Sequence, residues 1–182
     1  MKPQEFEAKR ETLVSAFQQK LQEKPELKRQ EIKLSWSNWG FGIESLEESA
    51  KRLHKHGVKW IELHGNRYGN DLGYRPKETL AVLDRYDIQV AGVCGMFGRE
   101  NDLSSNSAVH RQNAIDYIRR QLDLCHSLGG TYLLVVPGAV GRPQAYDDSE
   151  FERSVETLLI VAPEFASAGV RAAIEPIRSA EV

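Results

Sequence analysis

The stretch Gly169-Val170-Arg171-Ala172-Ala173-Ile174-Glu175-Pro176 decides how the rest of the chain is interpreted. Its glycine is typical of a turn, the short apolar run predicts a strand, and the proline ends backbone pairing directly after the carboxylate. Glu175 is therefore expected where that strand ends. A carboxylate at the carboxyl end of a buried parallel strand has the position that βα barrels use for catalysis.

Length and composition exclude several classes of protein. The 182 residues suffice for one domain with a sizeable core. The formal charge of -2 and the pI of about 6.2 disfavour nucleic acid as a partner. The N-terminus has no apolar core of a signal peptide, and no apolar run approaches the roughly 18 residues of a membrane span. The protein is therefore expected in the cytoplasm, without a membrane partner, and with Cys94 and Cys125 as buried thiols.

The first thirty residues do not share the pattern of the rest. Residues 3 to 23 place Phe6, Leu13, Val14, Phe17 and Leu21 at helical spacing among many charges, and a polar link follows. We expect an amphipathic N-terminal helix and link over residues 1–30, ahead of a domain over residues 31–182. This helix is expected either to cover the bottom of a barrel or to dock on a partner.

From residue 31 onward, predicted strands alternate with predicted helices. The strands are expected at residues 32–36, 58–63, 88–93, 131–136 and 170–174. Ser45 and Glu48 form a capping box, which predicts that a helix begins there. The last helix is expected to be capped by Asp147 and Asp148, and to kink or end early at Pro163.

Strands that alternate with helices favour a parallel sheet of the α/β class. An open doubly wound sheet and a closed (β/α)8 TIM barrel both fit the pattern. The barrel is preferred because no GxGxxG or GxxxxGK[ST] motif follows the first strand. A whole barrel typically needs ~250 residues, so about five βα units are present here and the barrel is incomplete. The chain is then either truncated or completed by another chain, and poor solubility or homo-oligomerisation is expected.

Three short motifs resemble a known family in their order and spacing. They are Ile174-Glu175-Pro176-Ile177 followed by Glu181, Trp60-Ile61-Glu62-Leu63, and Val135-Val136-Pro137-Gly138. Together they resemble the xylose isomerase-like TIM barrels, and most closely the sugar phosphate isomerase/epimerase set that includes D-tagatose 3-epimerase-like enzymes. The resemblance covers residues 31–182, the N-terminal portion of that fold.

The resemblance implies an activity and roles for two carboxylates. It implies a divalent-metal-dependent isomerase or epimerase of a sugar, sugar phosphate or related polyol, which moves a proton next to a carbonyl. By the same resemblance, Glu175 is a catalytic residue and a ligand of Mn²⁺, Mg²⁺ or Co²⁺, and Glu181 binds substrate. The family's other ligands, on strands six to eight, have no counterpart, so the chain is expected to be inactive alone.

Other candidate substrate-binding residues follow the first and second strands. Glu62 and His64 are two residues apart near a strand end, hence on one face, and they either line the pocket mouth or form a structural pair. Trp36 and Trp39 lie on the same rim, where an aromatic ring either stacks on a sugar or simply packs. Asp102, in the third loop, could also reach a polar ligand.

Two other functions compete with the isomerase. An endonuclease IV-like metal phosphodiesterase uses the same barrel, but it needs a cationic groove, which the near-neutral charge disfavours. A non-catalytic module would instead use its open strand edges and N-terminal helix for self-association. A stable dimer whose strands are completed by the second chain would favour this module.

Overall fold

The computed structural model describes residues 3–29, 33–65, 73–142 and 144–176. The chain divides into two compact units, Met1–Lys33 and Leu34–Val182. Each unit is described by itself. None of the helices in the described residues is both long enough and apolar enough to cross a membrane.

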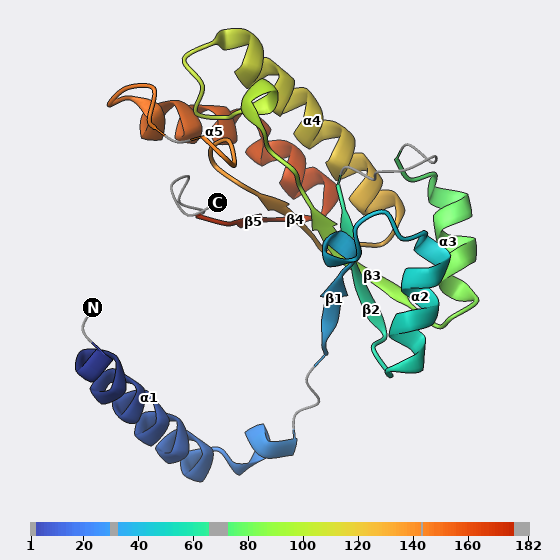
Figure 1. Ribbon diagram of the computed structural model, residues 1–182, viewed down its shortest axis with the longest axis vertical. Helices are drawn as coiled ribbons and strands as arrows, with labels where there is room; N and C mark the ends of the chain where they lie inside the picture. The colour runs from blue at the N-terminus through green and yellow to red at the C-terminus, as the bar shows by residue number, and fades with distance from the viewer. Residues whose placement is uncertain (1–2, 30–32, 66–72, 143, 177–182) are drawn as a thin grey trace. The chain divides into compact units, whose positions relative to one another are not determined.

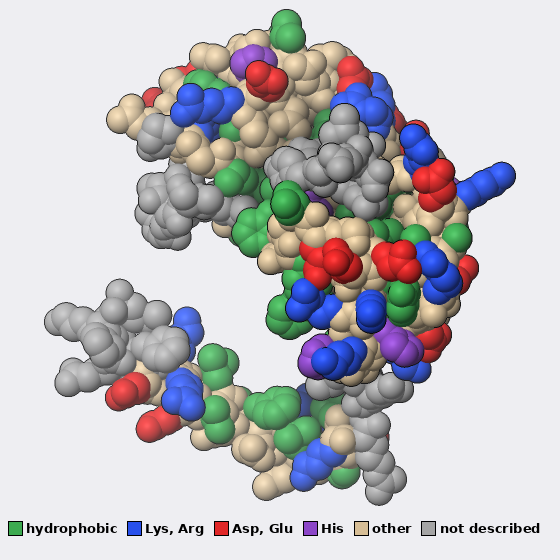
Figure 2. Space-filling view, turned by 45° about the vertical axis from the view of Figure 1, so that its right-hand side comes forward, with side chains coloured by type: hydrophobic (Ala, Val, Ile, Leu, Met, Phe, Trp, Pro, Cys, Tyr) green, Lys and Arg blue, Asp and Glu red, His purple; other side chains and the backbone are tan. Residues whose placement is uncertain are grey.

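The N-terminal unit consists of a long helix and a short one. Helix α1 (Pro3–Glu23) precedes the 3-10 helix η1 (Pro25–Arg29). Proline disfavours a helical backbone in the residue before it, which explains why α1 ends ahead of Lys24 and Pro25. The apolar side chains Leu13, Val14 and Phe17 are exposed, and Figure 2 shows hydrophobic side chains along this helix. The predicted N-terminal helix is therefore present.

The second unit is built on a five-stranded sheet in which all strands are parallel and follow chain order. Its strands are β1 (Ser35–Ser37), β2 (Trp60–His64), β3 (Gln89–Cys94), β4 (Tyr132–Val135) and β5 (Arg171–Ile174). The predicted number, order and direction of the strands are confirmed. Among the described residues, no strand pairs with the outer edge of β1 or of β5.

Helices connect successive strands and cover one face of the sheet (Figure 1). They are α2 (Leu46–Lys55), α3 (Pro76–Asp84), α4 (Ala108–Ser127) and α5 (Glu150–Ala168), with 3-10 turns η2 (Asn38–Phe41) and η3 (Arg99–Asn101). The capping box is confirmed, because the Glu48 amide donates to Ser45 Oγ at 3.2 Å and the Ser45 amide donates to the Glu48 carboxylate.

An early end of α5 at Pro163 and a cap at Asp147 or Asp148 were expected, and both are wrong. The helix does not end at Pro163 but continues to Ala168, because Val161 and Phe165 on either side of the proline are buried against the core. The N-cap is Ser149 rather than Asp147 or Asp148. Asp147 instead accepts a hydrogen bond from the Ser149 amide at 2.9 Å and pairs with Arg153.

Two apolar clusters lie between the sheet and its helices. One contains Ile61 and Leu63 of β2 with the inner faces of α2 and α3. The other contains Val93, Leu133 and Val135 with the inner faces of α4 and α5. Successive residues of a strand point to opposite faces of the sheet. The strand residues between these apolar ones therefore point to the face that the helices do not cover. That second face carries the candidate site.

Candidate functional site

The face of the sheet that faces away from α2–α5 is polar, and we call it the inner face. The strand register aligns Ser37, Glu62, Gly92 and Tyr132 in one row across four strands. The next row toward the carboxyl ends aligns His64, Cys94, Leu134 and Ala173. Alternation along each strand therefore brings side chains from distant segments together on one surface.

Glu62 and Tyr132 interact in the first of these rows. The Tyr132 hydroxyl donates a hydrogen bond of 2.7 Å to Glu62 Oε2. Burial raises the pKa of Tyr132 well above its ordinary value, and the bond to Glu62 raises it further. Tyr132 is therefore a protonated donor at neutral pH, and it orients the Glu62 carboxylate.

Gly92 makes room for the ring of Tyr132. A Cβ atom at residue 92 would lie 2.7 Å from the Tyr132 ring and 2.5 Å from the Tyr132 carbonyl oxygen. Both distances are shorter than non-bonded contacts allow. Glycine at this position therefore lets the neighbouring strand place an aromatic ring flat against β3.

Cys94 lies in the second row, within the influence of two carboxylates. Burial raises the pKa of its thiol to about 12, and the charges of Glu62 and Glu175 raise it as well. Cys94 therefore remains a neutral thiol at physiological pH. It is half-buried rather than buried as expected, whereas Cys125 is buried.

Glu175 follows β5 directly, at the carboxyl end of the sheet. Its backbone amide donates to the Val135 carbonyl at 3.0 Å, which continues the ladder one residue beyond the strand. The Glu175 side chain is exposed. Glu181, the second carboxylate that was expected to act here, lies outside the described residues.

The structure separates the remaining candidates. His64 ends β2 and is buried, and its amide donates to Asn38 Oδ1 at 2.7 Å. Asn38 in turn donates to the Tyr74 hydroxyl at 3.0 Å, so it fixes the loop after β1 to the end of β2. Trp36 pairs in register with buried Ile61 and lies on the helix-packed face. The structure brings Glu62, His64 and Glu175 to one face but does not bring Trp36 to it.

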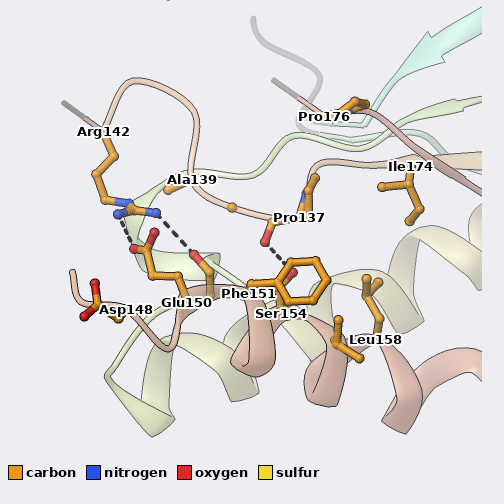
Figure 3. A pocket seen from close by; sticks show the side chains of 13 residues that line it. Pro137, Ala139, Arg142, Asp148, Glu150, Phe151, Ser154, Leu158, Ile174 and Pro176 are labelled. Carbon is orange, nitrogen blue, oxygen red and sulfur yellow. Dashed lines mark hydrogen bonds and ion pairs between the residues drawn. The ribbon is translucent and has the colours of Figure 1, made fainter. Parts of the chain in front are cut away.

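A buried ionic cluster, missed from the sequence, joins the loops after β3 and β4. The guanidinium of Arg142 lies 3.4 Å from the Asp102 carboxylate, donates to Ser104 Oγ at 3.2 Å, and pairs with Glu150 (Figure 3). The Arg142 guanidinium also lies over the Tyr146 ring, with its Cζ atom 4.2 Å from the ring centroid. Asp102 is fully buried, so it holds this cluster instead of reaching a ligand as expected.

An open groove of about 820 Å³ lies beside this cluster, between the start of α5 and the end of β5. Figure 3 shows Pro137, Phe151, Leu158, Ile174 and Pro176 around it. Ser154 Oγ donates to the Pro137 carbonyl at 2.6 Å and fixes the loop after β4 to α5. The groove is mainly apolar and lies on the helix-packed side of β5, away from the polar inner face.

The described residues do not form a metal site by themselves. Over residues 3–29, 33–65, 73–142 and 144–176, no group of three or more His, Cys, Asp or Glu side chains could hold a metal ion. Glu175 offers one carboxylate, whereas Mg²⁺ and Mn²⁺ prefer a shell of several oxygen ligands. Glu175 can therefore supply only part of a metal shell.

Comparisons with known proteins find the same architecture in sugar epimerases. D-allulose 3-epimerase from Methylomonas sp., solved in complex with D-allulose, matches with a TM-score of 0.71 and 16% identity over 81% of this chain and 52% of that one. D-psicose 3-epimerase from Clostridium cellulolyticum H10 matches with a TM-score of 0.69 and 19% identity over 83% and 54%. A 3-keto-D-glucoside 4-epimerase from E. coli matches with a TM-score of 0.65 and 19% identity over 82% and 57%.

The chain spans about half the length of these epimerases, so its five strands and helices form part of a TIM barrel. A search of curated proteins found no match. Residues 43–182 match the family described as xylose isomerase-like TIM barrel, whose members typically bind a divalent metal. The chain therefore belongs to the xylose isomerase-like TIM barrel family.

Proposed function

We propose that this chain carries part of the site of an isomerase or epimerase that acts on a sugar or sugar phosphate. The observation that supports this most is the position of Glu175, directly after β5 at the carboxyl end of a parallel sheet. Glu175 would act as the base that removes a proton next to a carbonyl. In the same proposal, Glu175 supplies one ligand of a divalent metal and Glu181 binds the sugar.

The inner face provides suitable groups for a polyhydroxylated ligand. Tyr132 and Cys94 remain protonated at neutral pH and keep their O–H and S–H donors, whereas Glu62 and Glu175 offer carboxylate acceptors. Such a mixture of donors and acceptors suits hydroxyl groups, each of which donates and accepts. The epimerases of similar architecture act on ketoses by their names, which supports a ketose as the ligand.

The remaining half of the barrel would supply the other metal ligands, so we propose that the chain does not turn over substrate by itself. Removing a proton next to a carbonyl requires charge stabilisation on the carbonyl oxygen as well as a base. The described residues include Glu175, the proposed base, but no group of three or more His, Cys, Asp or Glu side chains that could hold a metal ion. This chain is therefore expected to bind a ketose without converting it.

Ligand-detected NMR with D-allulose, D-tagatose and D-fructose in the presence of Mg²⁺ tests the proposal. We expect saturation transfer to a ketose without formation of its epimer. Glu175→Gln should weaken binding about tenfold or more, because a carboxylate that accepts hydrogen bonds contributes about 1.5–3 kcal/mol. Glu156→Gln, an exposed glutamate on α5, is the control and should bind as the wild type does. A folded wild-type chain that binds none of the three ketoses would exclude the proposed ligand class.

A further inference from the structure

The first row of the inner face contains an arrangement that packing alone does not require. The interiors of βα barrels are filled mainly by bulky branched side chains, and a polar group taken out of water is costly unless it is hydrogen-bonded. In this chain the row places Glu62 of β2, Gly92 of β3 and Tyr132 of β4 next to one another. A carboxylate, a phenol and a strand residue without a side chain therefore occupy positions that apolar side chains usually fill.

These three residues fix one carboxylate in place. Ile61 and Leu63 belong to the apolar cluster between the sheet and its helices, so Glu62 between them points to the inner face. The Tyr132 hydroxyl donates to Glu62 Oε2 at 2.7 Å from two strands away, and the ring fits over β3 because Gly92 has no Cβ atom. A carboxylate can accept about four hydrogen bonds, so Tyr132 orients Glu62 and leaves it able to accept others.

Glu62 lies on the amino side of Glu175 along the strand direction. The row that contains Cys94 and Ala173 comes next toward the carboxyl ends of the strands, and Glu175 lies two residues beyond Ala173. The row of Cys94 therefore lies between the two carboxylates, and the charges of both raise the pKa of the Cys94 thiol. Glu62 and Tyr132 thus lie deeper between the strands than Glu175 does.

We propose that Glu62 binds a terminal hydroxyl group of the sugar and that Tyr132 is the residue that positions it. The proposal rests on the function proposed above and adds how the ligand is oriented. With Glu175 at the carbon next to the carbonyl, Glu62 meets the end of the sugar that lies farthest toward the amino ends of the strands. A hydroxyl there donates to the carboxylate. A ligand without it leaves Glu62 unpaired, which makes the pair a determinant of specificity.

Deoxy sugars test the contact without any change to the protein. The probes are D-tagatose and its 1-deoxy and 6-deoxy forms, with Kd measured by ligand-detected NMR titration of the purified chain in Mg²⁺. One of the two deoxy forms should bind about tenfold more weakly than D-tagatose, because a hydrogen bond to a charged group is lost. Glu62→Gln should weaken D-tagatose about tenfold and that deoxy form not at all.

Tyr132→Phe tests the positioning role. It should weaken D-tagatose about threefold in the wild-type background and not at all in the Glu62→Gln background, because it acts only through Glu62. Tyr86→Phe is the matched control. It removes a bond of the same kind, from the Tyr86 hydroxyl to Glu47 at 3.1 Å, on the side of the sheet that the helices cover, and it should bind as the wild type does.

The outcomes separate this proposal from the function on which it rests. A wild-type chain that binds no ketose would overturn both. If D-tagatose binds, and Glu62→Gln either binds it equally well or weakens both deoxy forms as much as the parent sugar, only the role of Glu62 is overturned. A further loss when Tyr132→Phe is added to Glu62→Gln would overturn the positioning role of Tyr132.

Discussion

At the scale of single residues, the inner face depends on a glycine. Gly92→Ala places a methyl group against the ring and the carbonyl oxygen of Tyr132, and the backbone oxygen cannot rotate away. We expect the free energy of unfolding to fall by about 1–3 kcal/mol, the usual cost of an overpacked site. Gly40→Ala is the control because nothing lies within 4 Å of its Cβ position. Urea denaturation measures the unfolding free energy of both variants. Equal values for Gly92→Ala and Gly40→Ala would contradict the close contact between residue 92 and Tyr132.

The half-buried thiol of Cys94 predicts an alkaline loss of stability. Its pKa rises from an ordinary value of 9.0 to about 12 in the folded protein, so ionisation is easier after unfolding. A raised folded pKa contributes stability that is complete below pH 9 and is lost as the pH rises toward 12. Cys94→Ala should flatten the decline of unfolding free energy between these pH values, measured by urea denaturation at several pH values. If the unfolding free energy of Cys94→Ala falls with pH as steeply as that of the wild type, the raised pKa of Cys94 is contradicted.

Which residues meet on the inner face was only partly predictable. Glu62 and His64 could be placed on one face because they are two residues apart on a strand. The bond between Glu62 and Tyr132 joins residues 70 positions apart, and it depends on strand register, which sequence periodicity does not specify. Trp36 was expected on the rim, but a residue that ends a predicted strand can face either side of the sheet.

At the scale of secondary-structure elements, the cluster around Arg142 fixes the loops after β3 and β4. Arg142→Ala would leave fully buried Asp102 without its charge partner. Removing one member of a buried pair costs about 3–5 kcal/mol, so we expect a loss of that order in the free energy of unfolding. Arg119→Ala removes an exposed pair with Glu164 and should cost much less, because solvent screens an exposed ion pair. If Arg142→Ala loses no more unfolding free energy than Arg119→Ala, the stabilising role of the buried cluster is contradicted.

The elements themselves were largely predictable, because they depend on local patterns. The capping box at Ser45 and Glu48 marks a helix start that the structure confirms. Proline was a misleading signal inside α5, where packing of Val161 and Phe165 outweighs one missing backbone bond. The Arg142 cluster could not be predicted, since its members come from two loops without regular spacing.

At the scale of the whole molecule, five parallel strands in chain order are the architecture expected of part of a TIM barrel. The alternation of strands and helices predicted a barrel-type sheet, and the comparisons place that sheet in about half of a TIM barrel. Periodicity does not reveal how such a sheet is closed, because closure depends on surfaces that meet between distant strands or between chains.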